Sequence, residues 1–156
     1  MVFAGDIQLT NFDNLVEKYG LESVVVKLGY IKHEEVLSLL LSSDGLLFTI
    51  PKGDKLSYTG KIFEYLGTRK PIISFVSPEG PAGKLLFEFG QGDLIIDYDK
   101  SYASKIFSKL DQLKYIVTHP DEDLYAKIER KGQAGALAKI LRNIIKSQTT
   151  FSNSIK

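Results

Sequence analysis

Hydroxyl groups, a glycine and a lysine stand together just ahead of a segment with helical periodicity. They form the run Ser57-Tyr58-Thr59-Gly60-Lys61. The first backbone N–H groups of a helix have no partner within the helix, so together with hydroxyl and ammonium donors they form an anion site. The run is equally compatible with capping of the helix by Ser57 or Thr59, with Lys61 as a surface cation. It is not a Walker A loop, because the spacing of that motif is absent.

Glu64 lies about one turn into the helix that follows this run. A carboxylate in this position can accept hydrogen bonds from the vicinal hydroxyls of a ribose, as acidic residues do in dinucleotide-binding folds. The alternative is a solvated helix glutamate with Lys61 or Thr68 as its neighbour. No nucleophile and base stand at a spacing that singles out a catalytic pair, so we assign no catalytic residue.

The elements that must position these residues follow from the hydrophobic pattern. Apolar runs predict five short strands, at 2–5, 23–28, 45–50, 71–76 and 93–98. Helical spacing lies between the strands and continues at 102–116, 120–131 and 133–146. This alternation predicts an α/β fold, a Rossmann-like and mostly parallel sheet of about five strands with helices on both faces and extra C-terminal helices.

An open parallel sheet binds ligands at the turns that follow the carboxyl ends of its strands. The turn Gly29-Tyr30-Ile31 has a glycine that lets a ligand approach, although we favour a plain turn with an exposed tyrosine. The loop Pro51–Lys61 is longer than the usual loop of about 2–6 residues and leads into the anion site. The loop Ser77–Gly83 is either a lid or a plain connector.

Composition narrows the class of protein. The chain has 156 residues, 44% of them hydrophobic, which predicts one domain over 1–146 and a polar, frayed tail over 147–156. A net charge of +1 with mixed signs argues against nucleic acid as a partner. The lack of cysteine excludes disulfides, and two distant histidines argue against a metal centre. With no apolar run of about 20 residues and no signal peptide, we expect a cytoplasmic protein.

The segment Gly60–Ile73, with the sequence GKIFEYLGTRKPII, resembles the GKxxEYxxxxKPII segment of GT-B-fold glycosyltransferases. The closest match is the large family of retaining enzymes that use nucleotide-diphosphate sugars. Other parts of its donor-binding domain are matched in the same order, at Leu21–Glu35, Leu37–Leu47, Gly90–Asp99 and Gln133–Ile144. The resemblance therefore covers nearly the whole chain and implies the C-terminal, nucleotide-sugar-binding domain of such an enzyme.

The resemblance implies a role for each matching position. Glu64 would bind the donor ribose. The start of the helix would lie against the diphosphate, and the turn after the second strand would contact the base; these positions are Thr59, Gly60, Lys61, Tyr30 and Ile31. The implied ligand is a UDP- or GDP-type sugar nucleotide, with no metal or other cofactor. Leu56 stands where the family often has a second glutamate, which accompanies the transferred sugar.

The resemblance also implies what catalysis would require. The family's C-terminal domain opens with a strand, a glycine-rich turn and a helix that carry an arginine and a lysine, which neutralise the leaving diphosphate. Val2–Gly5 resembles the second strand of that domain rather than the first. We therefore expect an N-terminal acceptor-binding domain or a separate subunit as partner, and such a partner could also hold the chain at a membrane surface.

Three other classes of protein stay open at this point. One is a non-catalytic nucleotide-binding or regulatory module on the same fold, and another is a sugar-nucleotide epimerase of the GT-B type. The third is an unrelated α/β module such as a receiver domain. Asp44 argues against a receiver because it precedes its predicted strand, whereas receivers need an acidic cluster at strand ends.

Overall fold

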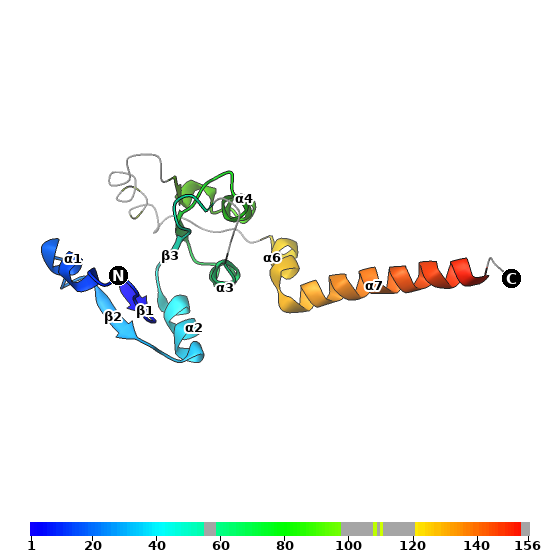
Figure 1. Cartoon of the computed structure of the whole chain (residues 1–156), viewed down its shortest axis with the longest axis horizontal. Coiled ribbons are helices and arrows are strands. Elements are labelled where there is room, and N and C mark those ends of the chain that lie inside the picture. Colours follow the sequence, from blue (N-terminus) through cyan, green and yellow to red (C-terminus); the bar gives the residue numbers. More distant parts are fainter. Residues whose placement is uncertain (55–58, 98–107, 109, 111–120, 154–156) are drawn as a thin grey trace. The chain divides into compact units, whose positions relative to one another are not determined.

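The structure, a computed structural model, describes residues 1–54, 59–97, 108, 110 and 121–153. These residues belong to two compact units, an N-terminal unit (Met1–Ser43) and a C-terminal unit that begins at Asp44. Figure 1 shows the helices and strands of both units, with labels where there is room. Each unit has its own parallel sheet and its own helices.

The N-terminal unit is a βαβ motif followed by one more helix. Its elements in chain order are β1 (Val2–Ala4), α1 (Phe12–Lys18), β2 (Val26–Gly29) and α2 (His33–Ser42). The two strands pair in parallel, and a 2.7 Å hydrogen bond from the Gly5 N–H to the Gly29 carbonyl extends the pairing. Gly29 then turns the chain with a φ of 64°, a conformation that glycine adopts without strain.

Helix α1 packs on one face of this small sheet. The rings of Phe3 in β1 and Phe12 in α1 meet edge to face, with centroids 5.2 Å apart. Lys27, which pairs beside Phe3, places its ammonium 5.9 Å from the centre of the Phe12 ring. Val26 and Leu28 alternate with Lys27 and therefore lie on the other face, where they are 48% and 43% exposed.

The C-terminal unit contains a three-stranded sheet with helices between the strands. Its elements are β3 (Leu46–Thr49), α3 (Lys61–Gly67), β4 (Ile72–Phe75), α4 (Pro81–Glu88), the 3-10 helix η1 (Gly92–Leu94), β5 (Ile95–Ile96), α6 (Glu122–Ile128) and α7 (Arg130–Asn153). The sheet order is β3-β4-β5, and both pairs are parallel. Because the strands follow one another in one direction, right-handed crossovers place α3 and α4 on the same face.

The core of the C-terminal unit surrounds β4. Phe48 is 2% exposed and meets the Tyr65 ring of α3 edge to face at 6.3 Å. The α3 side chains Ile62 and Leu66 are fully buried. A buried glutamine, Gln91, fixes the start of β4, because its side-chain oxygen accepts a 3.0 Å hydrogen bond from the Ile72 N–H. This core holds the first turn of α3 in a defined orientation.

The prediction of an α/β fold with parallel strands is confirmed. Four of the five strands lie within their predicted runs, and β2 begins within its run but ends one residue beyond it, at Gly29. The strands are divided between a two-stranded and a three-stranded sheet, whereas we expected one sheet. Periodicity identifies a strand from its own residues, but pairing depends on contacts with distant segments. Helix α7 continues to Asn153, beyond the predicted end at residue 146. The helix predicted at 102–116 lies almost entirely outside the described residues.

Candidate functional site

The predicted anion site lies where α3 begins. Gly60 is the N-cap residue, and the N–H groups of Ile62 and Phe63 donate to the carbonyls of Thr59 and Gly60, both at 3.1 Å. No side chain of a described residue caps the helix, so capping by the Thr59 hydroxyl is not the arrangement found. Thr59, Gly60 and Lys61 are all exposed. Their donors are therefore accessible to a ligand.

Helix α3 has a buried side and an exposed side. Ile62 and Leu66 are buried, whereas Lys61 and Glu64 are exposed. The pKa of the Tyr65 phenol is raised, first by burial and then by the negative charge of Glu64. The helical spacing of 58–67 predicts that Ile62, Phe63 and Leu66 face inward. Ile62 and Leu66 are buried as predicted, and Phe63 is half-buried.

Lys61 and Thr68 are the two neighbours that could pair with Glu64. The Thr68 hydroxyl donates to the Tyr65 carbonyl at 2.7 Å and accepts from the Lys70 N–H at 3.3 Å. Both of these hydrogen bonds are made with the backbone at the C-terminal end of α3. Within the described ranges Glu64 forms no ion pair, with Lys61 or with any other residue. The carboxylate of Glu64 is thus exposed and available on the first turn of α3.

A small pocket lies at the carboxyl ends of β3 and β4. Ile50 and Val76 follow these strands directly, and a 3.0 Å hydrogen bond from the Ile50 N–H to the Phe75 carbonyl joins the strand ends. Among the described residues the pocket is lined by Ile50, Asp54, Val76, Ser77, Gly80, Pro81 and Ala82. The residues Thr59–Glu64 are not part of this lining. The pocket is where the ligand rule for open parallel sheets places it.

The loop Ser77–Gly83 forms part of this pocket and packs tightly against the start of α4. A Cβ atom on Gly83 would lie 2.3 Å from the Ser77 carbonyl oxygen and 2.6 Å from that of Pro78. The Gly80 N–H donates to the Ser77 carbonyl at 3.1 Å. Only glycine permits so close an approach at position 83. Sequence reasoning missed Asp54 and Gly80 as lining residues, although it singled out the two loops that contain them.

The predicted base-contact residues belong to the N-terminal unit. Tyr30 directly follows the Gly29 turn, and its side chain is 91% exposed. Ile31 beside it is half-buried. The structure places these two residues within their own unit and the α3 residues within the other. Their shared role in contacting one ligand stays a prediction. Leu56, Ser57 and Tyr58 lie outside the described residues.

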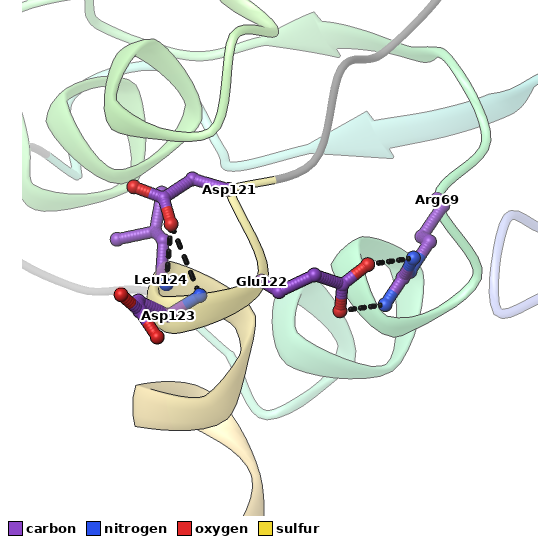
Figure 2. Close-up of polar contacts among 5 residues, drawn as sticks. All are labelled: Arg69, Asp121, Glu122, Asp123 and Leu124. Atoms are coloured by element: carbon purple, nitrogen blue, oxygen red, sulfur yellow. Dashed lines mark hydrogen bonds and ion pairs between the residues drawn. The ribbon is translucent and has the colours of Figure 1, made fainter.

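Arg69, which the sequence did not single out, connects the end of α3 to α6 (Figure 2). Its two terminal nitrogens each lie 2.7 Å from one carboxylate oxygen of Glu122, and its guanidinium lies 4.9 Å from the centre of the Tyr125 ring. The hydrogen bonds from Arg69 are the main cause of a lowered Glu122 pKa. Asp121 caps α6 by accepting from the N–H groups of Asp123 and Leu124 at 3.0 and 3.3 Å. This network anchors α6 rather than forming a ligand site.

Comparisons with protein-family models, with curated proteins and with solved structures found no match. The glycosyltransferase resemblance therefore rests on the segments of this sequence alone.

Proposed function

We propose that this chain is the donor-binding half of a glycosyltransferase, which moves a sugar from a nucleoside diphosphate to an acceptor. The observation that carries the proposal is the position of Lys61 and Glu64. Both side chains are exposed on the first turn of α3, where the loop from the carboxyl end of β3 enters the helix. Nucleotides bind at this end of open parallel sheets.

Different residues would bind the diphosphate and the ribose of the ligand. The hydroxyl of Thr59, the backbone at Gly60 and the Lys61 ammonium donate hydrogen bonds to the diphosphate, and the ammonium adds charge attraction. The Glu64 carboxylate accepts hydrogen bonds from the ribose hydroxyls. The ligand is a UDP- or GDP-type sugar nucleotide, and no metal or other cofactor is part of the proposal.

Sugar transfer requires groups beyond the donor site. An acceptor must be held next to the sugar, and the charge that develops on the leaving diphosphate must be stabilised by positive groups. We propose that an N-terminal acceptor-binding domain or a separate subunit provides both. Turnover should then depend on that partner, whereas nucleotide binding should not.

Titration of the isotope-labelled chain with UDP and with GDP, followed by amide NMR spectra, tests the donor site. We expect weak binding, with the largest shifts at Gly60, Lys61 and Glu64. Uridine and inorganic pyrophosphate, titrated separately, show which part of the ligand causes which shifts. If neither nucleoside diphosphate shifts any amide of the folded protein, the donor-site proposal is wrong.

The variant Glu64→Gln tests the ribose contact. A hydrogen bond to a charged group contributes about 1.5–3 kcal/mol, and the exposure of Glu64 favours the lower value, so UDP should bind about tenfold more weakly. Pyrophosphate lacks a ribose, so its affinity should not fall. Glu88→Gln is the matched control, because Glu88 is an exposed glutamate at the C-terminal end of a different helix, α4. Unchanged UDP affinity in Glu64→Gln would refute the assignment.

A further inference from the structure

An exposed apolar stripe runs along α7 (orange to red in Figure 1). Its five members follow the pattern i, i+3, i+4, i+7 and i+8, so they lie on one side of the helix. They are 57%, 56%, 51%, 49% and 63% exposed, in the order Leu137, Ile140, Leu141, Ile144 and Ile145. Isolated exposed leucines are ordinary on protein surfaces, but a contiguous stripe of this kind indicates a surface for interaction.

The charges of α7 are all of one sign. The helix contains five of the 20 basic residues of the chain and none of the 19 acidic ones. Glu129, directly ahead of the helix, is the last acidic residue of the sequence. At about 100° per residue, Lys139 and Arg142, which lie within the stretch that carries the stripe, project away from it. Arg130, at the start of the helix, projects to the same side as the stripe. Because the whole chain has a net charge of only +1, the positive charge is concentrated in α7.

The apolar stripe and the positive charge of α7 together match one kind of binding surface. An apolar stripe with basic residues on the opposite side is the pattern of helices that lie in the plane of a membrane interface. Among the described residues, no helix is long and apolar enough to cross a membrane. An anionic bilayer supplies an apolar layer for the stripe and negative headgroups for the cations.

A second copy of α7 is a poorer match for the same face. Helices that pair through an apolar seam gain specificity from flanking residues of opposite charge. Two α7 helices would bring only cations together, because the helix has no acidic residue. We therefore propose that α7 binds the surface of an anionic lipid bilayer. The apolar stripe lies toward the acyl chains, and the long side chains of Lys139 and Arg142 reach the headgroups.

Flotation of the full chain with vesicles tests this proposal. We expect binding to mixtures of phosphatidylcholine and phosphatidylglycerol, little binding to phosphatidylcholine alone, and weaker binding at high salt. Lys139→Gln and Arg142→Gln should each weaken binding by about fivefold. Leu141→Asp should weaken it by tenfold or more, because it replaces an apolar side chain that inserts among the acyl chains with a charged one.

Ala136→Asp is the matched control for Leu141→Asp, because it adds the same charge on another side of the same helix. Far-UV circular dichroism should show that both variants keep their helix content. Equal losses in the two aspartate variants, or no binding of the unaltered chain to anionic vesicles, would overturn the proposal. So would equal binding to phosphatidylcholine alone. A dimer that Leu141→Asp dissociates, without any vesicle binding, would assign the stripe to a second copy of the chain instead.

Discussion

Arg69 combines an unfavourable backbone conformation with three favourable side-chain contacts. Its φ of 59° is left-handed, which costs a residue with a side chain about 1–2 kcal/mol. The conformation ends α3, with the Arg69 N–H donating to the Leu66 carbonyl at 3.0 Å. The same conformation lets the side chain reach Glu122 with two hydrogen bonds and cover the ring of Tyr125. Arg69 therefore anchors α6 from a strained backbone conformation.

The Arg69–Glu122 pair should make stability depend on pH. Arg69 lowers the pKa of Glu122 in the folded chain, so the ionised carboxylate favours folding. This contribution is complete above about pH 4.3, the ordinary glutamate value, and is lost as pH falls through the lowered folded pKa. Glu122→Gln should thus lower the melting temperature near neutral pH, and the difference from the unaltered chain should shrink in acid.

Thermal unfolding followed by circular dichroism at a series of pH values measures this difference. Glu88→Gln is the control, because Glu88 is exposed on α4 and forms no ion pair among the described residues. Added salt should reduce the effect, since both partners of the pair are solvent-exposed. A difference in melting temperature that stays constant from neutral pH into acid would mean that Glu122 acts by packing alone.

At the scale of single residues, the sequence was informative wherever a local rule decides the outcome. Ile62 and Leu66 were placed correctly, because helical periodicity alone determines which side of α3 faces inward. Arg69 could not be found in this way. A positive φ at arginine is uncommon, and its partner Glu122 lies 53 residues further along the chain. The contact exists only because the core of the C-terminal unit brings α3 and α6 together.

At the scale of elements, a glycine determines the corner between α6 and α7. A Cβ atom on Gly132 would lie 1.8 Å from the carbonyl oxygen of Ala126, so any side chain there forces the two helices apart. Gly135, one turn later in the same helix, has no atom within 4 Å of its Cβ position. The two glycines therefore provide a matched pair of substitutions in α7.

Gly132→Ala should lower the free energy of unfolding by about 1–3 kcal/mol and speed amide exchange in α6. Gly135→Ala should raise it by about 0.5–1 kcal/mol, because alanine loses less backbone entropy in a helix. Urea unfolding of both variants, with hydrogen exchange of α6, measures the two effects. Equal stabilisation by both substitutions would show that the corner between the helices is not closely packed in solution.

Strand pairing shows why the elements were easier to predict than their assembly. The apolar run before Pro51 was correctly assigned to a strand, whereas only the last residue of the β-branched run Val24–Val26 belongs to β2, which extends to Gly29. The division into two sheets could not be foreseen, because the period of two is the same whichever strand lies alongside. The sequence pattern names the α3 residues as a candidate site, and their ligand role stays a prediction. The close packing of Gly83 against Ser77 and Pro78 could be recognised only from the coordinates.

At the scale of the whole molecule, the two units differ in how well they are packed. All residues of β2 in the N-terminal unit are exposed, whereas Ile72 and Ser74 in β4 of the C-terminal unit are fully buried. Buried apolar contacts and shielded hydrogen bonds determine how rarely a region opens. The N-terminal unit should therefore open more often than the C-terminal unit.

Native-state hydrogen exchange of the full chain tests this difference. We expect the β4 amides to exchange slowest, at a rate set by global unfolding, and the β1 and β2 amides to exchange much faster through local opening. Val26→Thr changes an exposed side chain and should leave β4 protection unchanged, whereas Ile72→Val trims a buried one and should reduce it by about 0.5–1.5 kcal/mol. Uniform protection of β2 and β4 would show that the two units unfold together. In that case the exposed face of the N-terminal sheet must be covered in solution, and the search for the covering surface would begin at Val26 and Leu28.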